Sequence, residues 1–399
     1  MKKLLLLLFV CIFLLQTGCW DRQELNEIAI VTGLAVDLGE NGHYVLSVEI
    51  LNPPALDPQT GGDRTASIVY SFRGQSIAEL FHKMNVAYTR TLIYSHMRTV
   101  VISEEVAKDG IAEFLDLLER DREVRNDFNI ITVSNANASD VLKITYPIQQ
   151  VSTMKLNTQL QTMVEEWSGD PEIRLKDIIE SLVAKGGEPV CAAVKIEGSS
   201  EKGSSMENTK TISPDAIVTL DGLSVFKGDN HIGKMELRDT RNYMWLTGKL
   251  RKTTMIVPCE DGKFVTATLK RSKTNVEAKY VNGIPTFHVS IVVEGKVAAS
   301  QCGLDFMEVD TIRDIEKKVA HSIESELRKT VETVQDEFQS DIFGFGEKMR
   351  IQDYENFLKV QDHWNEEFAR AKITFDITAK IRRTGLTTES FLNKVNESN

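Results

Sequence analysis

Apolar and polar residues near the start of the folded part alternate as they do in paired β-strands. Residues 28–37 are mostly apolar and β-branched, and residues 43–50 alternate with a period of two. Between these two runs, Glu40-Asn41-Gly42 supplies a turn signal. The pattern predicts an antiparallel hairpin. Further strands are expected at 67–72, 98–102, 128–133 and 191–196.

Segments with helical periodicity separate these strands. Residues 76–88, 104–119 and 173–185 each place their apolar side chains on one helix face. The third segment is followed by Gly186-Gly187, which is a signal for the C-terminal cap of a helix. The first half of the chain is therefore expected to combine strands with short packed helices.

The strongest helical pattern in the chain covers residues 311–338. Pairs of opposite charge such as Asp314/Lys318 and Glu324/Arg328 lie four residues apart on its polar side. Its apolar positions recur every three or four residues and form one stripe: Ile312, Ile315, Val319, Ile323, Leu327, Val331, Val334 and Phe338. This stripe predicts a long amphipathic helix that packs on a sheet.

The remaining pattern of the second half predicts a helix around Tyr243 and Trp245 and several strands. These strands are expected at 216–220, 223–226, 264–269, 275–280, 286–293 and 372–383. Because strands are grouped as hairpins with helices between them, the expected fold class is α+β, with several domains and mainly antiparallel sheets. The long amphipathic helix belongs to the C-terminal domain.

Residues 198–212 are rich in Gly, Ser and Lys and poor in apolar residues, which predicts a linker or mobile loop. The expected organisation places a leader at 1–18 and an N-terminal α+β region at 19–197, made of one or two subdomains. A C-terminal α+β domain follows at 213–386, and a tail at 387–399.

The leader has the marks of an export signal. Lys2 and Lys3 precede twelve consecutive apolar residues, a run shorter than the roughly 20 residues that span a bilayer. Thr17-Gly18-Cys19 resembles the end of a bacterial lipobox, in which the cysteine thiol receives a diacylglycerol and becomes the new N-terminus. Gln16 departs from that pattern. An ordinary signal peptide or an uncleaved anchor are the alternatives to lipidation of Cys19.

Charge and cysteine content narrow the possible partners. The formal net charge is −11, and removal of the two leader lysines makes it −13. An acidic body argues against nucleic-acid binding and gives no electrostatic attraction to anionic lipid. Beyond Cys11 and Cys19, three cysteines remain, at 191, 259 and 302. They are expected to be buried small apolar residues, although a disulfide between two of them is possible.

Motifs of catalysis are missing from the sequence. It contains no G-x-S-x-G, H-E-x-x-H, P-loop or G-x-G-x-x-G pattern, so no catalytic, cofactor or metal site is expected. The histidines are scattered singly, and His321 on the long helix is expected to be a surface or core residue. The mixed charges of RDREVRND at 120–127 are expected to form a solvated turn.

Two short segments each allow two interpretations. DIFGFGE at 341–347 is either a helix cap whose two phenylalanines tuck under the sheet or an exposed loop that binds a partner. KIRR at 380–383 is either a solvated strand end or a contact for lipid headgroups.

An ordered set of motifs resembles one known family. The set consists of the lipobox-like Cys19 followed by WDRQELN at 20–26, GLAVD at 33–37, GLSVFK at 222–227, WLTG at 245–248, DIFGFGE at 341–347 and KIRRTG at 380–385. Together they resemble the Ger(x)C family, the C-subunit lipoproteins of spore germinant receptors. The resemblance runs from Cys19 to about Gly385.

The resemblance implies a three-domain α+β lipoprotein on the outer face of the spore's inner membrane, anchored through diacylglycerol on Cys19. It also implies assembly with integral-membrane A and B subunits in a receptor that nutrients trigger. In such receptors the nutrient is thought to bind the transporter-like B subunit, so no small-molecule ligand is expected for this chain. A solute-binding lipoprotein of a transporter, which requires a two-lobed body with a cleft, is the alternative function. A surface hydrolase is a further alternative, but the sequence shows no nucleophile and base in a catalytic arrangement.

Overall fold

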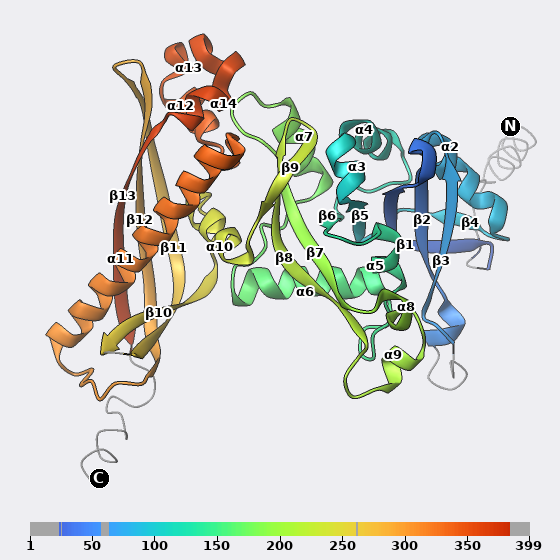
Figure 1. Cartoon of the computed structure of the whole chain (residues 1–399), viewed down its shortest axis with the longest axis horizontal. Helices are drawn as coiled ribbons and strands as arrows, with labels where there is room; N and C mark the ends of the chain where they lie inside the picture. Colours follow the sequence, from blue (N-terminus) through green and yellow to red (C-terminus); the bar gives the residue numbers. More distant parts are fainter. Residues whose placement is uncertain (1–23, 25, 57–63, 261, 384–399) are drawn as a thin grey trace, which may run out of the picture.

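The computed structural model describes residues 24–383 except 25, 57–63 and 261. Its strands form two sheets that lie beside each other along the long axis of the molecule (Figure 1). Among the described residues, nine strands form the first sheet in the order β3-β2-β1-β5-β6-β7-β8-β9, with β4 paired to β1. They are β1 (Ile28–Leu38), β2 (Tyr44–Leu51), β3 (Ser67–Gly74), β4 (Thr91–Ile93), β5 (Thr99–Ser103), β6 (Asn129–Val133), β7 (Val190–Gly198), β8 (Ala216–Lys227) and β9 (Asn230–Met235).

Strand direction changes across the first sheet. β2 and β3 on one side, and β8 and β9 on the other, run antiparallel to their neighbours. The expected hairpin of β1 and β2 is confirmed. In the centre, β1, β5, β6 and β7 are parallel to one another. The chain is α+β, as expected, with a parallel centre that the hairpin signals did not predict.

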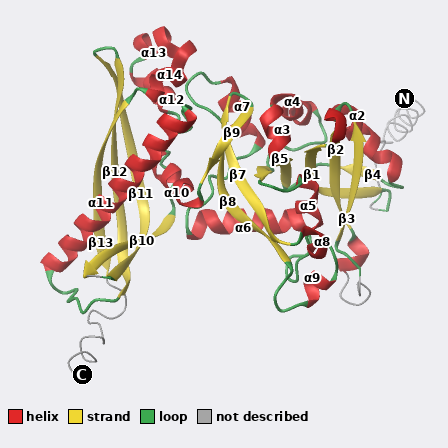
Figure 2. Ribbon diagram, in the orientation of Figure 1, coloured by secondary structure: helices red, strands yellow, loops and turns green. Residues whose placement is uncertain are grey.

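Helices cover both faces of the central strands (Figure 2). Leu34 and Val100 face one core, and their chain neighbours Ala35 and Val101 face a second core on the other side. All four side chains are fully buried, which explains the continuous apolar runs of β1 and β5. The first core includes α2 (Ile77–Lys83), α3 (Glu104–Asp109), α4 (Ala112–Arg120) and α7 (Leu175–Val183), and the second includes α5 (Ala138–Lys143) and α6 (Ser152–Glu166).

The second sheet has the order β10-β11-β12-β13. Its strands are β10 (Lys252–Glu260), β11 (Lys263–Val281), β12 (Ile284–Ser300) and β13 (Lys372–Arg383). β13 is parallel to β12, so the chain between them must cross over, and it does so through helices. These helices are α11 (Val309–Thr333), a π-helical turn (Val334–Phe338), α12 (Phe345–Gln352), α13 (Tyr354–Val360) and α14 (Trp364–Ala369).

The long helix confirms its sequence pattern. Six positions of the stripe, from Ile315 to Val334, are buried against the second sheet, whereas Ile312 and Phe338 at the two ends are only partly buried. Both expected ion pairs form on the polar side, Asp314 with Lys318 at 2.7 Å and Glu324 with Arg328 at 2.8 Å. The helix runs across the sheet as one long element in Figure 2.

Residues 198–212 differ from the expected linker. They form two short helices, α8 (Ser200–Gly203) and α9 (Glu207–Lys210), between strands β7 and β8 of the first sheet. The side chain of Asn208 is fully buried and bonds to backbone atoms of Thr145 and Ala216. A polar side chain thus fixes a segment whose composition predicted mobility. The strands expected to open the C-terminal domain are a single strand, β8, which pairs with β7 in the first sheet.

Candidate functional site

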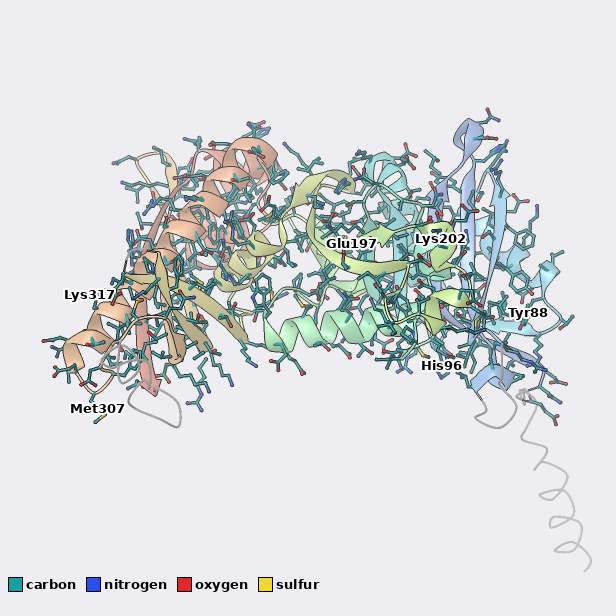
Figure 3. The ribbon with its side chains drawn as sticks, turned by 60° about the horizontal axis from the view of Figure 1, so that its bottom comes forward. Tyr88, His96, Glu197, Lys202, Met307 and Lys317 are labelled. Carbon is teal, nitrogen blue, oxygen red and sulfur yellow. A yellow bond between two sulfur atoms is a disulfide. The ribbon has the colours of Figure 1, made fainter. Side chains whose placement is uncertain are left out.

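Cys19, the predicted lipidation residue, lies outside the described residues. The chain that follows it enters the first sheet at β1, where the backbone N–H of Thr91 donates to the carbonyl oxygen of Glu27. This entry point lies at one end of the long axis, near Tyr88 in Figure 3, and Met307 and Lys317 lie at the opposite end. Within the described residues, no helix has both the length and the apolar character to cross a membrane.

The loop at 341–347 is the first candidate site that the structure settles. Phe343 and Phe345 are both buried, and the Phe345 ring stacks on Phe287 of β12 with 4.8 Å between ring centroids. The interpretation that both phenylalanines tuck under the sheet is confirmed, and that of an exposed partner-binding loop is wrong. The apolar ring area removed from water explains why this loop folds inward.

Asp341 organises this loop from inside. Its carboxylate is fully buried and accepts hydrogen bonds from the N–H groups of Phe343 and Gly346, at 3.1 and 2.8 Å, and from Nε1 of Trp364 at 2.8 Å. Burial raises the pKa of Asp341 to about 6, although the three donors favour its charged form. Sequence analysis did not find this role, because the Trp364 partner lies 23 residues further along the chain.

The same loop joins the two sheets. The N–H of Glu347 donates to the carbonyl oxygen of Gly186 at 3.0 Å, and the N–H of Glu188 donates to that of Asp341 at 2.8 Å. A β-carbon on Gly186 would lie 2.5 Å from the backbone nitrogen of Glu347, closer than such contacts allow. We call residues 184–188 and 341–347 the junction. Gly186, expected to cap a helix, also lets the two backbones of the junction approach without a side chain between them.

A cleft of about 560 Å³ opens beside the junction. Asp177 and Glu180 of α7 contribute carboxylates to its lining, and Lys249 and Lys348 contribute amines. Tyr243 of α10 (Leu237–Leu246) also lines the cleft, and burial raises the pKa of its hydroxyl. Because the lining comes from elements of both sheets, the shape of the cleft depends on how the junction packs.

A buried arginine connects α10 to the long helix. Arg241 pairs with Glu326 of α11 and donates to the carbonyl oxygen of Thr254 at 3.2 Å. Its guanidinium lies 5.6 and 5.5 Å from the ring centroids of Trp167 and Trp245, within the range of cation–π attraction. The sequence pattern identified the apolar side of this helix but gave no signal that its arginine would be buried.

Two buried carboxylates of the first sheet hold helix N-termini. Glu49 accepts hydrogen bonds from the N–H groups of Ser152 and Thr153 at the start of α6, at 2.9 and 3.1 Å. Asp37 accepts from those of Ala138 and Ser139 at the start of α5, at 2.5 and 2.9 Å. Burial raises the pKa of Asp37, and these bonds partly oppose the shift. Each carboxylate satisfies donors that a helix start leaves unpaired, so its role is structural.

The cysteines divide into a pair and a single thiol. Cys259 and Cys302 form a disulfide in the second sheet, and Cys191 is buried and unpaired. The expectation that all three are free apolar residues is wrong for the pair, whose partners lie 43 residues apart in the sequence. No group of three metal-binding side chains gathers within the described residues.

The remaining charged candidates lie at the surface. His321 is exposed on α11, and Asp121 accepts a hydrogen bond from the N–H of Glu123 at 2.8 Å within the charged turn. In the basic cluster of β13, Arg382 pairs with Glu294 at 2.8 Å and Lys380 is exposed. This arrangement is that of a solvated strand end.

These features define an elongated α+β body of two sheets, joined by interlocked loops and reached by a short chain from Cys19. The crystal structure of the GerBC protein shares this fold, with a TM-score of 0.55 and 20% identity, covering 88% of this chain and 96% of that one. The chain belongs to the family of GerAC-like spore germination proteins. Residues 21–196 match the spore germination protein N-terminal domain, and residues 221–385 match the spore germination B3/GerAC-like C-terminal domain.

Individual relatives extend this similarity over nearly the whole chain. The chain is 31% identical to spore germination protein KC of Bacillus subtilis (strain 168) over 397 residues, which is 96% of each chain. It is 24% identical to spore germination protein B3 of the same organism over 375 residues, covering 92% of this chain and 94% of that one. The family domains divide the chain between residues 196 and 221, whereas the sheets divide after β9.

Proposed function

We propose that this protein is the lipid-anchored C subunit of a nutrient germinant receptor, which it assembles with integral-membrane A and B subunits to trigger spore germination. The observation that carries the proposal is the place where the family similarity begins. The N-terminal family domain starts at residue 21, directly after the lipobox-like Gly18-Cys19. The proposed lipid acceptor and the matched spore germination domain are thus neighbours in one chain.

The proposed anchor is a diacylglycerol on Cys19. Two acyl chains provide stable attachment, whereas one chain gives only marginal and reversible binding. The body then lies on the outer face of the membrane. The Cys259–Cys302 disulfide supports this location, because disulfides persist in oxidising compartments outside the cytosol.

Anchoring also explains how a subunit without an enzymatic role contributes to a receptor. On the membrane surface, the body meets the A and B subunits at a raised effective concentration, so contacts of modest affinity suffice for assembly. The backbone hydrogen bonds of the junction join the two sheets, so the body acts as a scaffold that positions contacts on one sheet relative to the other.

The test is mass spectrometry of the N-terminal peptide together with a Cys19→Ala strain. We expect a diacylglyceryl peptide that begins at Cys19, and a variant protein that is folded, absent from the membrane fraction and unable to support normal germination. A Cys191→Ala strain is the matched control, because it removes a thiol that is buried and unpaired, and it should retain the anchor. Normal germination with normal amounts of the Cys19→Ala protein would contradict the proposal.

A further inference from the structure

The chain from Cys19 enters the first sheet next to the loop of residues 84–90. β4 pairs in parallel with the start of β1, with Ile28 opposite Thr91. The residues that precede two parallel strands emerge at the same end of the sheet. Residues 84–90, which precede β4, therefore lie next to the entering chain.

The length of that chain limits where a lipid on Cys19 can be. Ile28 is nine residue steps from Cys19, and a fully extended chain spans at most about 3.3–3.6 Å per step, or roughly 30 Å in total. A bilayer that holds Cys19 is therefore within about 30 Å of the start of β1. Residues 84–90 are at this end of the long axis, and Met307 and Lys317 are at the other (Figure 3).

The loop presents a fixed set of exposed side chains toward this end. Val86 is 81% exposed although Met84, two residues before it, is buried in the core. Asn85 holds the loop in place by accepting a hydrogen bond from the N–H of Leu92 at 3.0 Å. The half-buried ring of Tyr88 packs edge-on against Tyr70, with 5.5 Å between centroids. The exposure of Val86 thus follows from a defined loop conformation.

The chemistry of these residues suits the boundary between lipid headgroups and acyl chains. Tyrosine is enriched at that boundary, and an arginine can extend its guanidinium to a phosphate while its stem stays on apolar surface. Arg90 has no carboxylate partner among the described residues, whereas Lys83 is paired with Glu79. Glu24 and Glu27 on the entering chain offset the positive charge, so the contact depends on Val86 and Tyr88 as well as on Arg90.

We propose that Val86, Ala87, Tyr88 and Arg90, here called the tether-end surface, rest on the lipid surface beside the anchor and fix the orientation of the body on the membrane. This inference builds on the proposed lipidation of Cys19. Because the anchor already holds the body at the bilayer, a weak contact is enough to favour one orientation. The second sheet, with its free end at Met307, then points away from the site of attachment.

The test measures backbone amide exchange on the chain from Cys19 onward, coupled through its Cys19 thiol to a maleimide lipid in phosphatidylethanolamine/phosphatidylglycerol vesicles. Coupling is selective because Cys191 is buried and Cys259 and Cys302 form a disulfide. We expect exchange in residues 84–90 to slow about tenfold relative to the same chain capped with a soluble maleimide, and exchange around Met307 to stay unchanged.

Val86→Glu should abolish the slowing and leave the protein on the vesicles. Val183→Glu is the matched control, since Val183 is a valine of similar exposure, 78%, on α7, and it should keep the slowing. Equal exchange on and off vesicles would overturn the inference, and so would slowing that occurs only in native membranes, because a protein partner would then cover the surface. Chemical coupling separates these outcomes from the proposed function, which fails if the cell does not acylate Cys19.

Discussion

Gly186 and Gly346 meet backbone to backbone where the two sheets join. A β-carbon on Gly186 would lie 2.6 Å from the carbonyl carbon of Gly346, and one on Gly346 would lie 2.6 Å from the α-carbon of Gly186. Neither position has room for a methyl group. Gly346 belongs to the loop that the buried carboxylate of Asp341 holds in place, so the contact couples the packing of the first sheet to the internal order of the second.

Gly186→Ala should therefore loosen the junction. Backbone atoms, which cannot rotate away as a side chain can, surround the new methyl group, so we expect a loss of about 1–3 kcal/mol in the free energy of unfolding. Urea denaturation measures the loss, and limited proteolysis should show faster cleavage near 184–188. Gly187→Ala is the matched control, because its β-carbon would come no closer than 3.4 Å to its neighbours. If Gly186→Ala and Gly187→Ala were equally stable, the junction would accommodate a methyl group at Gly186 and the prediction would be wrong.

Asp170 should make stability depend on pH. Its side chain is only 2% exposed, and burial raises the pKa of its carboxyl to about 7, against about 3.9 in an unfolded chain. The native state therefore holds a proton that the unfolded state releases, and this contribution to stability is complete below about pH 4 and lost as the pH rises through about 7. Asp341, with a pKa of about 6, acts in the same direction.

Asp170→Asn isolates the effect, because the amide oxygen can still accept the 2.8 Å hydrogen bond from the N–H of Glu172 but does not titrate. Between pH 5 and pH 8, the free energy of unfolding of the wild type should fall by about 2–3 kcal/mol more than that of the variant. Urea denaturation at the two pH values gives this difference. A constant difference between the proteins at both values would mean that Asp170 is charged throughout.

Reduction of the Cys259–Cys302 disulfide should destabilise the second sheet. The bond closes a segment of 43 residues, and the loop-entropy relation gives an upper value of about 4 kcal/mol for such a closure. Denaturation with and without a reductant, or of a Cys259→Ala/Cys302→Ala variant, measures the change. Cys191→Ala should respond to the reductant as the wild type does, because its thiol is not part of the bond. If the reductant did not change the denaturation midpoint of the wild type, the Cys259–Cys302 disulfide would be contradicted.

The spacing of apolar residues along the sequence correctly predicted the helices and strands that bury one face along their whole length. The stripe from Ile315 to Val334 identified the long helix, because one helix face packs on one sheet over many turns. The alternation of apolar and polar residues at 43–50 and the turn signal at 40–42 predicted the hairpin of β1 and β2, because both signals lie within one short stretch of sequence. For the 341–347 loop the sequence left two interpretations, and the burial of Phe343 and Phe345 under the sheet decides between them.

Features that depend on distant partners were missed. Nothing near Cys259 in the sequence indicates that it pairs with Cys302, and Arg241 is buried because two tryptophans and Glu326 meet it in space. The segment at 198–212 was expected to be a linker or mobile loop because its composition is polar. Composition does not show the hydrogen bonds with which Asn208 holds it to Ala216. The pairing of β8 with β7 in the first sheet was not predicted, because strand pairing, unlike strand formation, is not a local property.

The parallel pairing of β12 with β13 sets the order in which the second sheet can be completed. Val289 lies opposite Phe375, and the α-helices α11 to α14 lie between the two strands in the chain. Contacts so far apart in the sequence form slowly, because a long loop must close before they are gained. During synthesis, β12 therefore keeps one edge unpaired until β13 has been made. β13 covers this edge of β12 and then forms an edge of the sheet itself, so β12 stays open to pairing with another chain until β13 is in place.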